Sequence, residues 1–190
     1  MYLFFDTETT GLPKDWKAPL SKLDNWPRMV QLAYMLYDKE GNKLQEADLI
    51  IKPEGYTIPK EAADVHGITT DIANQKGIPL ELALASFYEA AQTAEVLVAH
   101  NMAFDEMIVG AELLRKNKHN IIPIKKRICT MQSTVNFCKI PSKYGFKWPK
   151  LTELHYKLFD TDFVDAHNAY VDISITAKCF WKMKAMGIID

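Results

Sequence analysis

The sequence predicts a mixed α/β layered fold, and the order of its apolar patterns carries that prediction. Short apolar segments dominate the first third of the chain, and helix-like and strand-like patterns alternate after it. Strands followed by alternating helices and strands are typical of a sheet covered by helices. With 190 residues, 48% of them hydrophobic and 25% charged, the chain fits one domain with a proper core. We therefore expect a single domain over residues 1–190.

The first strands are predicted to form an antiparallel meander. Residues 2–5 are apolar and aromatic, and a glycine and a proline break the chain soon after them. The segment RMVQLAYMLYD is apolar on both faces, which is typical of a central strand. KEGNK then favours a hairpin turn into a partner strand, KLQEADLIIKP. Between the first two strands, residues 14–27 are polar with two prolines and two tryptophans, and they predict a surface insertion.

After these strands, segments with the apolar spacing of helices alternate with short apolar runs typical of strands. Leu80, Leu84, Phe87 and Ala91 recur at helical spacing, and EVLVAHN then predicts a buried strand. AFDEMIVGAELLRKN predicts a helix and IIPIKKRICT another strand. Apolar residues at helical spacing within 151–158 and 169–180 predict two final helices.

Composition excludes several classes of protein. The formal net charge is −1, so any basic surface for nucleic acid has to be local. The three cysteines are far apart and form no C-x-x-C pair, which argues against a disulfide framework or a cysteine zinc site. The N-terminus lacks the basic region of a secretion signal, and no apolar run is long enough to span a membrane. We therefore expect a soluble cytoplasmic protein without a membrane partner.

Two acids follow the first strand directly. Successive strand residues point to opposite faces, so Asp6 and Glu8 share one face at a spacing of about 7 Å. Carboxylates this close repel each other unless a cation lies between them, and Mg2+ prefers oxygen ligands of this kind. A solvated turn with two surface acids is the alternative, and this motif alone leaves it open.

Two further segments place acids and a histidine at the ends of elements. In LVAHNMAFDEM, Asp105 falls in the first turn of a helix at a strand exit, where an acid also simply complements the helix dipole. In DAHNAYVDISITAKCF, His167 and Asp172 are five residues apart, or about 140° around an ideal helix. Both can face one cleft only if His167 lies on the loop before the helix. A surface histidine and one exposed acid are the alternative.

Together, the three segments resemble the three exonuclease motifs of the DEDDh family, the proofreading-type 3'-5' exonucleases similar to the epsilon subunit of bacterial DNA polymerase III. The motifs occur in the expected order over nearly the whole chain, and TTGL, VHGIT and KWPKLTELHYKLF also match. Asn168 stands four residues before Asp172, where the sister DEDDy branch would carry a tyrosine. The resemblance implies an RNase H-like three-layer fold. Its mixed five-stranded sheet would have antiparallel strands 1–3, then parallel strands, with helices on both sides.

The resemblance also implies an activity. It implies a 3'-5' exonuclease that removes nucleoside 5'-monophosphates from single-stranded nucleic acid or a frayed 3' end, with DNA favoured over RNA. Asp6, Glu8, Asp105 and Asp172 would bind two Mg2+ or Mn2+ ions, which stabilise both the attacking and the leaving oxygen. His167 would be the general base, since an unperturbed pKa near 6.5 suits proton transfer at neutral pH.

Substrate contacts are implied for a second set of residues. The backbone after Asp6, including Thr7 and Thr9, would meet the terminal 3'-hydroxyl, and Leu12 would wedge against a base. His66 would line the terminal-nucleotide pocket, although a turn histidine bonded to nearby backbone is an equal alternative.

We expect a structural role for His100 and surface positions for His119 and His155.

The segment CKIPSKYGFKWPK is locally basic, with four lysines interleaved with three aromatic residues. Lysines beside aromatic rings can hold a nucleic-acid strand through phosphate contacts and base stacking. The alternative is a solvated loop whose aromatic residues dock on the domain.

Two other functions stay open at this stage. One is a non-catalytic nucleic-acid-binding or polymerase-tethered module, although such a module has no need of clustered acids that repel phosphate. The other is a phosphodiesterase specific for short oligonucleotides. A polymerase or homodimer partner is also possible on the sequence alone.

Overall fold

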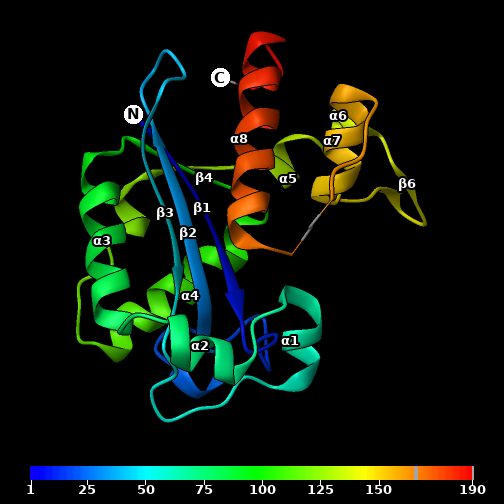
Figure 1. The fold of residues 1–190 in the computed structure, drawn as a ribbon. Coiled ribbons are helices and arrows are strands. Elements are labelled where there is room, and N and C mark those ends of the chain that lie inside the picture. Colours follow the sequence, from blue (N-terminus) through cyan, green and yellow to red (C-terminus); the bar gives the residue numbers. More distant parts are fainter. Residues whose placement is uncertain (165–166, 190) are drawn as a thin grey trace.

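A single five-stranded sheet organises the computed structural model, which describes residues 1–164 and 167–189 (Figure 1). The strand order is β3-β2-β1-β4-β5. The strands are β1 (Tyr2–Thr9), β2 (Met29–Tyr37), β3 (Lys43–Ile50), β4 (Val96–Ala99) and β5 (Lys126–Cys129). The first three pair antiparallel, whereas β4 is parallel to β1 and β5 is parallel to β4. The predicted meander followed by parallel strands is confirmed.

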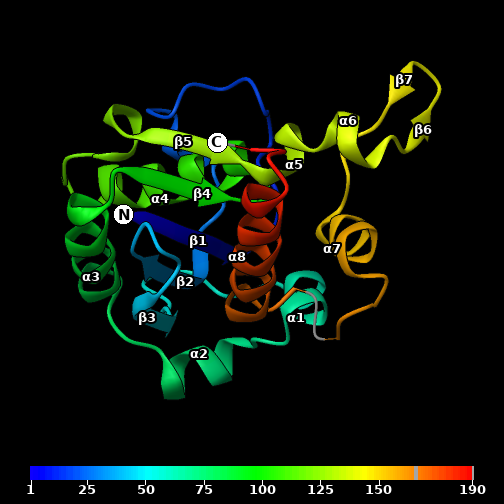
Figure 2. The same cartoon turned by 90° about the horizontal axis from the view of Figure 1, so that it is seen from above.

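Helices cover both faces of this sheet, which gives three layers (Figures 1 and 2). On one face, Leu3 and Phe5 of β1 pack in a core that includes residues of α3 (Leu80–Thr93) and α4 (Met102–Arg115). On the other face, Phe4 packs against α8 (Ala169–Ala185), in a core with four buried residues of that helix. Alternation along β1 therefore assigns its odd-numbered and even-numbered residues to different helical layers.

Smaller elements surround these layers. They are α1 (Lys60–His66), α2 (Thr70–Lys76), α5 (Thr130–Ser133), α6 (Val135–Cys138), α7 (Leu151–Phe159), two short 3-10 turns, and a hairpin of β6 (Pro141–Ser142) and β7 (Gly145–Phe146). The α7 helix packs against α8 through Leu154, Cys179 and Met183. Within the described part of the chain, no helix has the length and apolar character needed to cross a membrane.

Two expectations from the sequence need correction. The strand expected in IIPIKKRICT is confined to its last part, because residues 122–124 form a 3-10 turn before β5 begins. His155 is buried at 2% exposure, not on the surface. Its Nδ1 donates to the Thr161 carbonyl at 2.8 Å, and its ring packs on Phe159 with the centroids 4.8 Å apart.

The insertion at residues 14–27 is fastened to α4. Trp26 within it is only 4% exposed, and the Arg115 guanidinium donates to the carbonyls of Leu23 and Trp26 at 2.7 Å each. Trp16 is 56% exposed, and its ring lies 5.8 Å from that of Phe104. The insertion is therefore a folded cover on α4, with one tryptophan exposed.

A buried carboxylate holds the insertion, β2 and α4 together. Glu112 of α4 is fully buried, and its Oε1 accepts from the Arg28 Nε at 2.9 Å and from the Met29 backbone N–H at 2.9 Å. The Arg115 Nη1 lies 3.0 Å from the same oxygen. A buried acid with two guanidinium partners leaves uncompensated charge when it is removed.

We predict that Glu112→Gln lowers the free energy of unfolding by about 3 kcal/mol, because it leaves Arg28 and Arg115 without their buried carboxylate partner. Urea denaturation monitored by circular dichroism measures the loss. The matched control is Glu81→Gln, which removes an exposed pair with Lys118 and is expected to cost no more than about 1 kcal/mol. Equal losses in the two variants would contradict a structural role for Glu112.

Candidate active site

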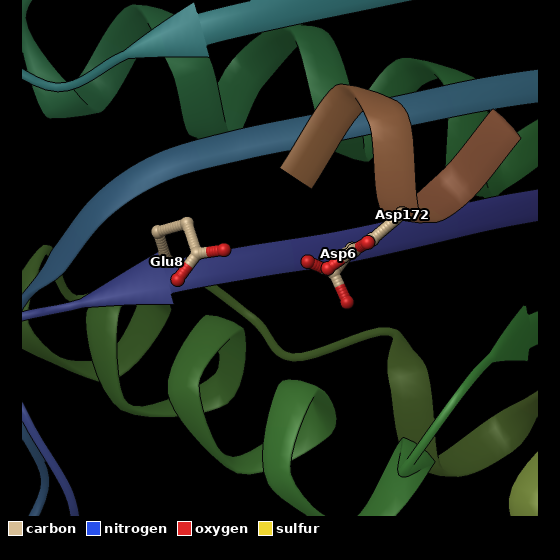
Figure 3. A group of neighbouring side chains, drawn as sticks. All are labelled: Asp6, Glu8 and Asp172. Atoms are coloured by element: carbon tan, nitrogen blue, oxygen red, sulfur yellow. The ribbon is translucent and has the colours of Figure 1, made fainter. Parts of the chain in front are cut away.

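Three carboxylates converge where β1 meets the first turn of α8 (Figure 3). Asp6 and Glu8 project from β1, and Asp172 projects from α8 toward them. One ligand oxygen from each residue lies within 4.8 Å of the other two. The expected shared face of Asp6 and Glu8 is thus the face that α8 covers, and a residue 164 positions beyond Glu8 completes the group.

Buried polar contacts set the position of this first helical turn. The Gln31 side chain on β2 accepts from the backbone N–H of Ala169 at 3.3 Å and donates to Asp48 at 2.6 Å. Gln31 is paired with Glu8 across the sheet, so the same strand register places both. The Asn168 side chain caps the helix by accepting from the N–H groups of Tyr170 and Val171.

Asp105 reaches the site from the opposite layer. It lies in the first turn of α4, as the sequence predicts, and is 2% exposed. Its Oδ1 accepts from both the backbone N–H and the hydroxyl of Thr7, at 3.0 and 2.8 Å. Because Thr7 lies between Asp6 and Glu8 and points to the α4 side, β1 connects acids from both layers.

Burial raises the pKa of all four acids, and the charges of neighbouring acids add to the rise at Asp6, Glu8 and Asp105. Burial and then the charges of Asp105, Asp172 and Glu8 raise the pKa of Asp6 well above its usual range. Burial, with the charges of Asp172 and Asp105, raises the pKa of Glu8 to about 8. Burial raises the pKa of Asp105 to about 7 against the opposing hydrogen bonds from Thr7. Burial also raises the pKa of Asp172, against the hydrogen bond from His167.

This donor set suits divalent cations. Carboxylate oxygens are the preferred ligands of Mg2+ and Mn2+. The Oδ1 of Asp172 is buried and has no hydrogen-bond partner among residues 1–164 and 167–189. A cation among the acids would satisfy that oxygen and offset both the burial and the repulsion that disfavour the charged carboxylates.

His167 lies just before the α8 cap, with φ at +70°. Its backbone N–H donates to Asp172 Oδ2 at 3.1 Å, and the residue is exposed. His167 therefore lies on the loop that enters the helix, which is the condition under which it and Asp172 can face one cleft. The two residues before it in the motif, Asp165 and Ala166, fall outside the described part of the chain.

These groups share one cleft of about 360 Å3. Asp6, Thr7, Glu8, Leu12, Trp16, His100, Asn101, Phe104, Asp105, Leu151, His167 and Asp172 line it. Leu12 is 72% exposed, which leaves its side chain available to a ligand. The cleft thus combines an acidic floor with apolar walls.

Two of the predicted substrate contacts do not line the cleft. Thr9 is 8% exposed, and its hydroxyl donates to the Gly11 carbonyl at 2.6 Å. His66 ends α1 at 7% exposure, and its Nδ1 accepts from the backbone N–H of Ile68 at 3.1 Å. The contact with Ile68 matches the turn alternative, while Nε2 has no partner within the described residues. Burial lowers the pKa of His66, partly offset by the backbone of Thr9.

His100 connects the cleft to the segment before α7. Burial lowers the pKa of His100 to about 4, so the ring is neutral at pH 7. Its Nε2 lies 3.1 Å from the Pro149 carbonyl and therefore donates, which leaves Nδ1 to accept from the Thr130 hydroxyl at 2.9 Å. The expected structural role fits these contacts.

Sequence reasoning missed five residues that line the cleft: Trp16, His100, Asn101, Phe104 and Leu151. Trp16 and Phe104 meet only because the insertion folds over α4, so their spacing in the sequence carries no signal. Asn101 could have been predicted, because it directly precedes the helix that carries Asp105. In the structure it is the N-cap residue of α4, with φ +83°.

Solved structures share this fold. Exonuclease I of E. coli, crystallised with single-stranded DNA and zinc, aligns over 97% of this chain and 40% of its own, with 20% identity and a TM-score of 0.76. Its complex with a dT13 oligonucleotide aligns over 96% of this chain and 40% of its own, with 20% identity and the same TM-score. Exonuclease I of Methylocaldum szegediense gives 97% and 40% coverage, 18% identity and a TM-score of 0.76.

At these identities the likeness establishes the fold, and the expected RNase H-like architecture is confirmed. The chain spans about 40% of the length of these exonucleases. A comparison with curated protein sequences finds no match. The family model RNase_T, described as exonuclease, matches residues 3–180, a range that contains every acid of the site. The chain therefore belongs to the RNase_T exonuclease family.

Proposed function

We propose that this chain is a divalent-metal-dependent 3'-5' exonuclease that releases nucleoside 5'-monophosphates from single-stranded nucleic acid, DNA in preference to RNA. The observation that carries the proposal is the convergence of Asp6, Glu8 and Asp172 within 4.8 Å on the floor of a cleft, in a member of an exonuclease family. The bound oligonucleotides of the E. coli structures support a single-stranded substrate.

The acids would hold two Mg2+ or Mn2+ ions. Asp6, Glu8 and Asp172 would bind one, and Asp6 with Asp105 would bind the second. Bound ions supply positive charge that stabilises the negative charge developing during phosphodiester hydrolysis, and they lower the pKa of water. The chain supplies fixed carboxylates from three elements, so the ligands need little rearrangement.

His167 would take the proton of the attacking water on an imidazole nitrogen. Its position at the rim of the cleft, beside Asp172, supports that role. A histidine is suited to proton transfer near neutral pH. The hydrogen bond from its backbone to Asp172 would keep the base next to the acids.

The terminal nucleotide would lie against the apolar wall of the cleft. Leu12 would contact the base, with Trp16 and Phe104 beside it, and the backbone from Thr7 to Thr9 would meet the 3'-hydroxyl. The roles of Thr9 and His66 as substrate contacts stay predictions, as does a terminal-nucleotide pocket.

One of the two alternatives is weaker on physical grounds. A non-catalytic binding module would be hindered by four clustered acids that repel phosphate. A phosphodiesterase of short oligonucleotides shares the chemistry and differs only in substrate length. A cytoplasmic location and a polymerase or homodimer partner stay predictions.

We predict that Asp172→Asn lowers exonuclease activity by at least about 100-fold, because it removes a metal ligand. The test compares 3'-labelled and 5'-labelled DNA and RNA oligonucleotides with Mg2+, Mn2+ or chelator. A 5'-labelled strand should shorten from its 3' end, and free nucleoside 5'-monophosphate should accumulate. Asp71→Asn in α2, an exposed acid, is the control. Digestion in chelator, or an active Asp172→Asn enzyme, would refute the proposal.

Replacing the proposed base should affect turnover more than metal binding. His167→Ala is expected to lower kcat by about 100-fold to 10,000-fold, the usual contribution of a general base. Its affinity for Mn2+, followed by calorimetry, should stay near the parental value. The exposed His119 provides the matched control, His119→Ala. A His167→Ala enzyme that digests at the parental rate excludes the assigned role.

The raised pKa of Glu8 predicts a pH-dependent stability in chelator. The unfolded chain loses the Glu8 proton near pH 4.5, whereas the folded chain keeps it to about pH 8. The proton therefore stabilises the fold below pH 4.5, and that stability is lost as the pH rises to about 8. Glu8→Gln should raise the free energy of unfolding at pH 8 by about 0.5–2 kcal/mol, because it removes a buried charge, and stabilising substitutions commonly have effects of this size.

The measurement is urea unfolding at pH 5 and pH 8, with chelator and with Mn2+. Mn2+ should stabilise the parent more than Glu8→Gln, because the variant has lost a ligand. Identical pH profiles for parent and variant in chelator would show that Glu8 is not under electrostatic strain.

A further inference from the structure

A short hairpin between α6 and α7 extends away from the body of the molecule (Figure 2). We call residues 139–150 the arm. Its two short strands pair Pro141 with Phe146 and Ser142 with Gly145, and the Lys147 N–H donates to the Ile140 carbonyl at 2.9 Å. The arm is therefore an ordered hairpin.

The aromatic residues of the arm face solvent. Tyr144 is 88% exposed, Trp148 is 60% exposed and Phe146 is 47% exposed. Aromatic side chains this large normally bury most of their area. The alternative in which they dock on the domain does not hold, so their apolar faces are available to a ligand.

The arm is also basic. It contains four lysines and no acidic residue. Lys147 is engaged with Glu153 at 2.6 Å, but Lys139, Lys143 and Lys150 have no carboxylate within 4.0 Å across the described ranges 1–164 and 167–189. The Lys143 ammonium lies 5.2 Å from the centre of the Tyr144 ring. Cations and open ring faces thus alternate along one short segment of a chain whose net charge is −1.

The base of the arm touches the active-site cleft. The Pro149 carbonyl accepts from His100, and both His100 and Leu151, the first residue of α7, line the cleft. From Pro149 to Tyr144 the chain can extend at most about 18 Å. The tip can therefore reach nucleotides beyond the one held at the acids.

We propose that the arm binds single-stranded nucleic acid upstream of the 3' end that lies in the cleft. Tyr144 and Trp148 stack on bases, and Lys139 and Lys143 contact phosphates. Alternating cations and aromatic faces are the usual means of holding a single strand without reading its sequence. This inference rests on the proposed exonuclease function, because it assigns the direction in which the substrate leaves the cleft.

The test uses oligothymidylates of 20 and 2 nucleotides, of which only the longer can extend from the cleft along the arm. Binding is measured in chelator by fluorescence anisotropy, and cleavage is measured with Mn2+. Tyr144→Ala/Trp148→Ala should weaken binding of the 20-mer by at least about 10-fold, since each stacked base contributes about 1–3 kcal/mol. Cleavage of the dinucleotide should keep the parental kcat/KM.

A salt titration tests the lysines separately. Lys143→Ala should reduce the slope of log Kd against log salt by about 0.7, the value for one phosphate contact on a single strand. Lys76→Ala in α2 is the matched control for Lys143→Ala, and Leu82→Ala in α3 is the control for the aromatic variant. Both residues are exposed and lie on elements away from the arm. Equal urea midpoints establish that the variants fold.

The outcomes separate the two proposals. If the parent cleaves both substrates and the aromatic variant binds the 20-mer with parental affinity, the arm inference is wrong and the exonuclease proposal stands. If the parent cleaves neither substrate, the exonuclease proposal fails, while binding in chelator still measures the arm. An unchanged salt slope in Lys143→Ala excludes the phosphate contact.

Discussion

Repulsion among four carboxylates at the end of the central strand is the constraint on which the site depends. Asp6 and Glu8 cannot move apart, because both lie in the stretch of β1 that is paired with β2. Asp172 and Asp105 are brought up to this strand from opposite layers. Burial and the charges of Asp172 and Asp105 raise the pKa of Glu8 to about 8, so this arrangement disfavours four free negative charges. The core that fixes the three layers therefore has to supply the energy that holds the acids together.

Buried polar contacts at the site hold the acid-bearing elements in place. Gln31 holds the start of α8, and its cross-strand neighbour Glu8 lies on the face that α8 covers. A shift in the register of β1 and β2 would therefore displace both Glu8 and Asp172. Thr7 uses its N–H and its hydroxyl to hold Asp105 on the other layer. These contacts bind ligand-bearing groups without neutralising them, which leaves the negative charge available to cations.

Local periodicity made much of this predictable. Alternation along residues 2–8 places Asp6 and Glu8 on one face. The five-residue spacing shows that His167 and Asp172 can share a cleft only if His167 lies on the loop before the helix. The short helices α1 and α2, the burial of His155 and the meeting of Trp16 with Phe104 could not be predicted in this way. Each depends on contacts between segments far apart in the chain, and side-chain periodicity carries no information about such contacts. The polar composition of residues 14–27 similarly concealed the buried Trp26.

The acidic floor also explains why binding groups should lie elsewhere on the molecule. A phosphodiester that approaches four carboxylates is repelled until cations intervene, so the acids themselves contribute little to holding a strand. The cleft offers Leu12, Trp16 and Phe104 on its walls, but it has a volume of only about 360 Å3, near the lower end of the range for small-molecule sites. A polymer therefore has to be held outside the cleft, by groups close enough to keep its end aligned with the acids. In a chain without overall positive charge, the arm meets both conditions: it is locally basic, and its base shares His100 with the cleft.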